Sequence, residues 1–310
     1  PEVSQLQNVL DVSNPLFVKI GNPELKPAKE NNLTIRLMNR SPEKEHHFFV
    51  MLSASKTENY VSNATYIIHS DTLVQNVSVK RGSQLTVPTN VDGYYTVRSF
   101  GVYGFPLKFI KSNLNLNFGY TVKNTPAIIN SELNKSLNNT LSGGLYLASN
   151  ISPNLDFSLS YNGNYNMVTN SLQSKSDNTY YNYTASLKIN YLFHKRLVLN
   201  TDINQSQYFG LSKSYNQDFI LWNAYIGYKF LKNQTLELKL SVYDILNQNK
   251  TISRTITETY SEDSDTQSLK RYALFTLTYT FKHFKAGATG PQEMKFPKNM
   301  PPPPGNMPPP

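Results

Sequence analysis

The sequence predicts an all-β fold: a transmembrane antiparallel up-and-down β-barrel, to which this 310-residue chain contributes about eleven strands. Three observations predict this fold. Apolar and polar residues alternate over long stretches, aromatic residues gather toward the ends of those stretches, and the connections between them are short and long in turn. Together these features are typical of outer-membrane barrels.

The alternation is clearest between Leu155 and Met167. One side of this stretch is apolar and the other is entirely polar, and successive side chains of a strand point to opposite faces. Thirteen residues exceed an ordinary strand but suit a tilted strand that crosses a bilayer, which needs about 9–11. The apolar set is Leu155, Phe157, Leu159, Tyr161, Tyr165 and Met167, and the polar set is Asp156, Ser158, Ser160, Asn162, Asn164 and Asn166.

The same period recurs along the chain and predicts further strands. It is least clear in 94–106 and 137–148, where glycines and mixed faces blur it. Aromatic residues such as Trp222, Tyr228 and Phe230 fall where an interfacial girdle would lie. The expected strands are 31–40, 46–58, 94–106, 113–123, 137–148, 155–167, 181–193, 197–208, 219–230, 235–246 and 269–281.

The connections between these strands alternate in length. Short turns are expected at 41–45, 108–112, 150–154, 194–196 and 231–234, and longer polar stretches at 59–92, 124–136, 169–180, 209–217 and 248–267. Outer-membrane barrels have short periplasmic turns and long extracellular loops. A soluble β-repeat or lectin-like domain is the alternative, but it has no reason to keep this order.

Composition excludes several other classes of protein. No run of about 18 apolar residues could form a membrane-spanning helix. The absence of cysteine excludes disulfides, thiolate catalysis and cysteine-bound metals. The net charge of +9 is spread thinly, which argues against nucleic-acid binding. No catalytic motif accompanies the five histidines, so we expect neither an enzyme nor a cofactor.

An odd strand number predicts that further strands precede these residues. If the last strand ends at the periplasm, the first of eleven runs inward from outside, whereas bacterial single-chain barrels have an even number of strands. The sequence also opens at Pro1 without a signal peptide, which an outer-membrane protein requires. We therefore expect the gene product to begin upstream.

Three segments resemble the TonB-dependent receptor family, in the outer-membrane β-barrel branch common in Bacteroidetes. The first is Ser4–Asn32, with the element G-N-P-E-L-K-P as its most specific part. The second is Leu238–Asn249 with the following Ile-Ser-Arg, and the third is Arg271–Phe281. The likeness covers about residues 4–284. The family element comprises Gly21, Asn22, Pro23, Leu25, Lys26 and Pro27.

The resemblance implies a barrel of about twenty-two strands that encloses a plug domain and is energised through TonB–ExbB–ExbD. It thus implies uptake of an unidentified ligand, although neither plug nor TonB-contacting segment lies in this chain. A non-transporting structural barrel in a protein assembly is the alternative. The resemblance also favours Tyr279, Phe281 and Phe284 as a signal for the barrel-assembly machinery, although they could be lipid-facing aromatics only.

Candidate ligand contacts are aromatic residues near the expected extracellular loops, namely Tyr60, Tyr66, Tyr180, Tyr181 and Tyr208. His46 and His47 are adjacent in a strand and point to opposite faces, so they cannot chelate one metal. The acidic residues Glu262, Asp263 and Asp265 lack the remaining features of a calcium loop and are expected to be a solvated loop.

The expected organisation has three parts in an outer-membrane protein. Residues 1–30 form an extracellular loop that leads into the first strand, and residues 31–284 form the barrel strands in contact with outer-membrane lipid. Residues 285–310 form a proline-rich periplasmic tail. Polyproline II or disorder is expected there, because proline fixes φ and lacks an amide donor. The tail could bind a periplasmic partner, but a solvated tail is the simpler reading.

Overall fold

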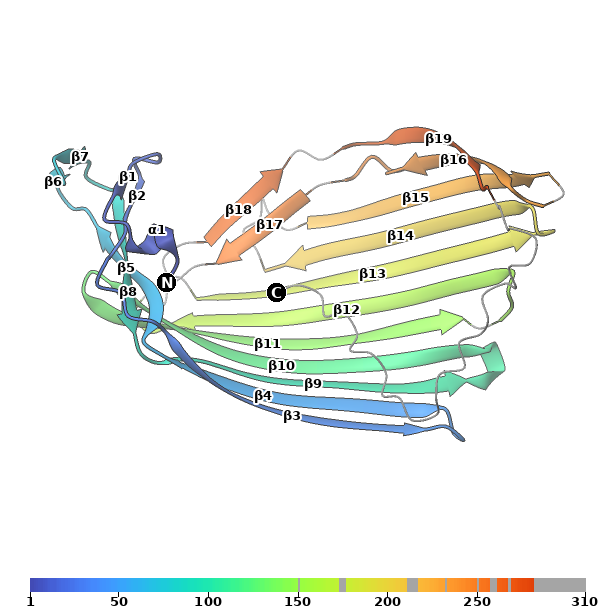
Figure 1. Ribbon diagram of the computed structural model, residues 1–310, viewed down its shortest axis with the longest axis horizontal. Helices are drawn as coiled ribbons and strands as arrows, with labels where there is room; N and C mark the ends of the chain where they lie inside the picture. Colours follow the sequence, from blue (N-terminus) through green and yellow to red (C-terminus); the bar gives the residue numbers. More distant parts are fainter. Residues whose placement is uncertain are drawn as a thin grey trace.

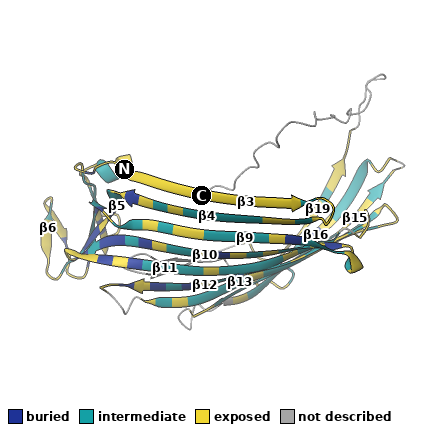
Figure 2. Ribbon diagram, turned by 90° about the horizontal axis from the view of Figure 1, so that it is seen from below, coloured by how far each residue is buried: buried dark blue, intermediate teal, exposed yellow. Residues whose placement is uncertain are grey.

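The chain is seen here in a computed structural model, in which most of the strands form one large curved sheet (Figures 1 and 2). The backbone alone is described for residues 217, 251–256 and 261–266. The described residues are 1–149, 151–172, 177–210, 217–231, 233–249, 251–256, 261–266 and 269–281.

Eleven strands of the described chain form an open trough, each antiparallel to its neighbours. They follow one another in sequence order, which confirms the predicted up-and-down meander. Every predicted strand overlaps one of them. In spatial order they are β3 (Lys29–Ser41), β4 (His46–Glu58), β9 (Tyr94–Leu107), β10 (Ser112–Ile129), β11 (Glu132–Ser149), β12 (Leu155–Asn170), β13 (Asn178–Phe193), β14 (Leu197–Phe209), β15 (Gln217–Phe230), β16 (Leu236–Tyr243) and β19 (Tyr272–Tyr279).

The prediction of a long loop at 124–136 was wrong. Strands β10 and β11 continue through this stretch and meet at Asn130 and Ser131, whose φ angles are 48° and 70°. Two successive positive φ values are those of a type I′ turn, which joins paired strands tightly. The polar residues that suggested a loop serve the sheet instead: the Asn124 side-chain amide donates to the carbonyl of Gly93 at 2.7 Å.

The predicted loop at 59–92 and the first 28 residues fold together at the end of the trough opposite the short turns (Figure 1). We call this unit the cap, and the end that carries it the long-loop end. Strand β2 pairs with β8, β8 pairs with β5, and β5 adds a short parallel pairing with β10. Its elements are α1 (Val3–Leu6), β1 (Leu10–Asp11), β2 (Phe17–Ile20), β5 (Tyr60–Ile67), β6 (Thr72–Val74), β7 (Val77–Val79) and β8 (Gln84–Val91).

The remaining described elements lie in connections. A 3₁₀ turn, Lys108–Ile110, joins β9 to β10 at the short-turn end. A two-stranded ribbon of β17 (Thr251–Ile256) and β18 (Ser261–Thr266) lies between β16 and β19. The described residues contain no helix that is long and apolar enough to span a membrane.

The strand register joins the alternating residues into continuous rows. Residues directly opposite on neighbouring strands share a face, so each row lies on one side of the sheet. One row reads Leu155, Tyr191, Leu199, Ile226, Leu240 and Phe275. A row on the other side reads Thr34, Ser53, Arg98, Thr121, Thr140, Asn166 and Tyr180.

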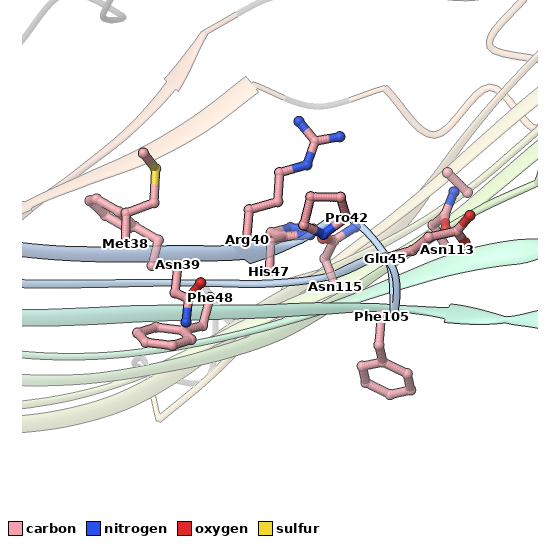
Figure 3. Close-up of a pocket in the computed structure, with 12 residues that line it drawn as sticks. Met38, Asn39, Arg40, Pro42, Glu45, His47, Phe48, Phe105, Asn113 and Asn115 are labelled. Atoms are coloured by element: carbon pink, nitrogen blue, oxygen red, sulfur yellow. The ribbon is translucent and has the colours of Figure 1, made fainter.

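The two faces are visible at the short-turn end of β3 and β4. Figure 3 shows Met38 and Arg40 projecting to one side of the sheet, toward the hollow of the trough, and Phe48 and Phe105 projecting to the other. The outer, apolar face carries many exposed large side chains, including Leu33 at 65% and Phe118 at 58%. A sheet that leaves such residues uncovered requires an apolar surrounding on that side.

Aromatic residues mark both ends of the apolar face. On β13, Tyr181 and Tyr183 lie at the long-loop end and Tyr191 and Phe193 at the short-turn end. Ten residues separate the corresponding members, or about 34 Å of strand. At a tilt of about 40° this corresponds to about 26 Å, close to the roughly 25 Å apolar band of outer-membrane barrels.

The deeply buried apolar side chains of the described residues lie in the cap or toward the long-loop ends of β10 and β12. The eleven long strands contribute few because their apolar face points outward. The buried apolar set is Val18, Leu25, Ala64, Val79, Val91, Ala127, Ile129 and Val168.

The assignment of faces predicts opposite outcomes for two neighbouring residues. Leu159 lies on the apolar face, midway between the aromatic ends, and Ser160 lies on the polar face. Leu159→Arg should lower the free energy of unfolding by about 2–4 kcal/mol, since it places a charge in the apolar band, whereas Ser160→Arg should cost little. Reversible unfolding of the full-length protein in lipid bilayers measures both, and equal tolerance would contradict the assigned faces.

Candidate functional site

The family element at Gly21–Pro27 fastens the first strand to the cap. Asn22 is its centre: its backbone N–H donates to the carbonyl of Gln5 at 2.7 Å, and its side-chain amide donates to the carbonyl of Pro88 at 3.1 Å. Its side-chain oxygen accepts from the N–H of Glu24 at 3.0 Å. Gly21 lies so close to the backbone of Gln7 that a Cβ there would collide with it.

Asn90 of β8 completes this attachment. Its side-chain oxygen accepts from the N–H of Lys26 at 2.7 Å, and its amide donates to the carbonyls of Lys26 at 3.0 Å and Asn59 at 2.8 Å. Leu25, between these contacts, is buried. The element therefore has a structural role: it holds the start of β3 against β8 through hydrogen bonds between asparagine side chains and backbone groups.

The outer part of the cap is held by charge. The carboxylate of Asp71 accepts from the Lys80 ammonium at 2.8 Å and from the N–H of Arg81 at 2.9 Å. These two bonds, with that to Lys80 the larger cause, lower the pKa of Asp71. Gln75 at the tip of the β6–β7 hairpin also donates to the Asn8 side chain at 2.8 Å. The hairpin is thus fixed at both its base and its tip.

The second family segment ends β16 in a loop organised by Asp244. This residue is 2% exposed and has a left-handed φ of 51°. Its carboxylate accepts from the N–H groups of Gln248 at 2.8 Å and Asn249 at 3.1 Å. Its own N–H donates to the Asn223 side chain of β15 at 2.9 Å. The predicted strand 235–246 consequently stops at Tyr243.

Amides and hydroxyls dominate the polar face over β11–β14. The Thr140 hydroxyl donates to Asn166 at 2.9 Å, and the Ser186 hydroxyl donates to Asn204 at 2.6 Å. A single ion pair, Lys188–Asp202 at 3.6 Å, lies on this face within the described residues. This wall is therefore a hydrogen-bonding surface of little net charge.

A pocket of about 640 Å³ opens where this face meets the cap, within the usual range of small-ligand sites. We call it the mouth pocket. One side of it is a row of three residues directly opposite one another, Glu30 of β3, Thr57 of β4 and Tyr94 of β9. The first residue of β5, Tyr60, and Glu2 beside α1 also line it.

Aromatic stacking shapes the mouth pocket. The rings of Tyr60 and Tyr94 are 4.1 Å apart between centroids and inclined by 14°, which is a stacked pair. The Lys123 ammonium lies 5.8 Å from the centroid of the Tyr94 ring, within the range of a cation–π contact. The pair is a rigid aromatic surface at the mouth of the trough.

The five candidate tyrosines occupy three different surroundings. Tyr60 lines the mouth pocket, and Tyr66 lies half-buried in β5. Tyr180 and Tyr208 share the polar face at the long-loop end. Tyr181 lies on the apolar face, where its hydroxyl is hydrogen-bonded to that of Tyr161. Sequence reasoning missed Tyr94, which is the first residue of the predicted strand 94–106 and was not among the candidate ligand contacts.

The other candidate residues are placed as follows. His46 and His47 lie on opposite faces, and the His46 ring is hydrogen-bonded to the Tyr103 hydroxyl at 2.7 Å. The described part of the chain contains no cluster of three or more potential metal ligands. Tyr279 and Phe281 pack edge to face with centroids 4.5 Å apart. Phe284, the acidic side chains at 262–265 and the tail at 285–310 lie outside the described residues.

Loss of the Asn90 side chain should loosen the cap. Asn90→Ala removes three hydrogen bonds to backbone groups and should lower stability by about 1–3 kcal/mol. Hydrogen exchange at the amide of Lys26 should become faster. Asn63→Ala, on an exposed residue of β5, is the matched control and should change little; a similar effect of both would contradict the role of Asn90.

The Asp244 loop gives a second prediction. Asp244→Ala should destabilise the protein by about 2–3 kcal/mol, because two loop N–H groups lose a charged acceptor. Asp244→Asn keeps one acceptor oxygen and tolerates the left-handed backbone, so its cost should be smaller. Unfolding and hydrogen exchange at Gln248 and Asn249 measure this order, and identical behaviour of both variants would refute it.

Comparison with known proteins identifies the family. A model of the Outer membrane protein beta-barrel family matches residues 1–279, which is most of the chain. No curated protein and no solved structure matches it. The family agrees with the long meander, the outward apolar face and the aromatic ends described above. This chain therefore belongs to the outer membrane protein beta-barrel family.

Proposed function

We propose that the chain is the C-terminal barrel part of an outer-membrane TonB-dependent receptor, which takes up a ligand across the outer membrane. The observation that carries the proposal is the open sheet. In the described residues β3 and β19 are edge strands that pair on one side only. Unpaired backbone groups at such edges would be unsatisfied in lipid.

Closure of the sheet therefore requires further strands. Eleven is an odd number, and bacterial single-chain barrels have an even one. The receptor family's barrel of about twenty-two strands would supply the remainder from upstream. The three family segments support this reading, and two of them form the structural joints at Asn22 and Asp244.

In this proposal the long-loop end faces outward and the short turns face the periplasm. The cap and the mouth pocket then lie on the cell surface, where ligand arrives. Tyr60, Tyr66, Tyr180 and Tyr208 are the candidate contacts. Tyr181, on the apolar face, would serve the membrane interface instead.

The partners of the proposed receptor follow from its position. TonB–ExbB–ExbD would act through a plug domain encoded upstream, and the barrel-assembly machinery would recognise Tyr279, Phe281 and Phe284 during insertion. A periplasmic partner of the tail at 285–310 belongs to the alternative, a structural barrel without transport.

The upstream part of the gene tests the proposal. We expect it to encode a plug-like domain and a TonB-contacting segment, and the purified full-length protein should bind the periplasmic domain of TonB in a pull-down. Deletion of the TonB-contacting segment should abolish that binding. If no plug-like domain is encoded, or if TonB binding survives the deletion, the result contradicts the proposed TonB-dependent transport. It then favours the alternative, a structural barrel.

A further inference from the structure

The charge of the mouth pocket runs against that of the chain. The sequence has a net charge of +9, yet the charged side chains that line this pocket are the glutamates Glu2 and Glu30. Within the described residues Glu30 forms no ion pair. The ion pair nearby joins Lys29 to Glu58, with the nitrogen and oxygen 4.0 Å apart. The side chains that line the pocket thus carry negative charge on a positive protein, while the Lys123 ammonium lies beside the pocket against the Tyr94 ring.

The aromatic pair of Tyr60 and Tyr94 adds a second attraction for a cation. An aromatic ring presents a negative face to a cation, and tyrosine is a good partner for ammonium and guanidinium groups. The Lys123 ammonium lies over the Tyr94 ring, 5.8 Å from its centroid, which is one such contact within the protein. The stack of Tyr60 on Tyr94 fixes both rings at the edge of the pocket and limits the loss of side-chain entropy on binding.

A hydroxyl lies on the same wall, because Thr57 lines the mouth pocket. A hydroxyl oxygen accepts from N–H donors, so it is a suitable acceptor for a cation that carries N–H groups.

We propose that the mouth pocket binds a ligand through a protonated amine or a guanidinium group. Glu30 and Glu2 supply opposite charge, Tyr60 and Tyr94 supply an aromatic wall, and the Thr57 hydroxyl accepts an N–H. The inference deepens the proposed function by naming the chemical class of the ligand, so its relevance to uptake rests on that proposal. The binding of such a ligand to the pocket can be tested without it.

A labelled trilysine peptide tests the inference. Fluorescence anisotropy with the purified full-length protein in non-ionic detergent should show tighter binding of trilysine than of triglutamate. High salt should reduce the difference, because exposed charges are screened. Equal affinity for the two peptides would overturn the proposal.

Matched variants locate the binding. Glu30→Gln should weaken trilysine binding by about 3- to 5-fold, the effect of one exposed ion pair, and adding Glu2→Gln should weaken it further. Thr57→Val keeps the shape and removes the acceptor, and it should also weaken binding. Glu24→Gln, an exposed glutamate of the cap outside the pocket, should have no effect. If Glu30→Gln behaves like Glu24→Gln, binding lies elsewhere and the inference fails.

The two proposals fail differently. Binding of trilysine that depends on Glu30, in a protein that does not bind TonB, would leave the pocket assignment intact and remove the transport proposal. Binding to TonB together with equal affinity for both peptides would leave the transport proposal intact and remove the pocket assignment. Unchanged circular dichroism of each variant shows that a lost affinity is not a lost fold.

Discussion

The need to pair every backbone N–H and C=O group governs this structure. In the apolar band no water is available, so each strand must be hydrogen-bonded along its full length. The register between β10 and β11 accordingly runs without interruption from the short-turn end to the two-residue turn at Asn130 and Ser131. Because the backbone groups are paired within the sheet, they make no demand on the side chains. The outward face can therefore be apolar and the inner face polar.

The same constraint divides the protein into two parts that are stabilised differently. The long strands bury few apolar side chains within the described chain, so their apolar face depends on an apolar surrounding outside the protein. The cap stands outside the apolar band and needs a core of its own, which Val18, Ala64, Val79 and Ile129 help to provide. The short parallel pairing of β5 with β10 joins these two parts.

Sequence reasoning predicted the strands well where one face is apolar and the other polar, as in β12. It failed at 124–136, where Asn124 and Asn134 are buried polar residues of paired strands and therefore look like loop residues. Among the cap strands that it missed, β6 and β7 have three residues each, too few to show a period. The family element was found, but its partner Asn90 lies 64 residues away from Lys26 and only the fold brings them together.

One group of side-chain amides and carboxylates acts where the regular sheet ends. Asn22, Asn90 and Asp244 each bind backbone groups that have left the ladder, so they replace strand pairing with local bonds. This explains why short polar motifs are the recognisable parts of an otherwise repetitive sequence. The joint at Asn90 also matters for the mouth pocket, since it holds the start of β3, and with it Glu30, near Tyr60 and Tyr94. A binding site composed of residues from four strands needs such a fixed frame, because its geometry is only as well defined as the joints between them.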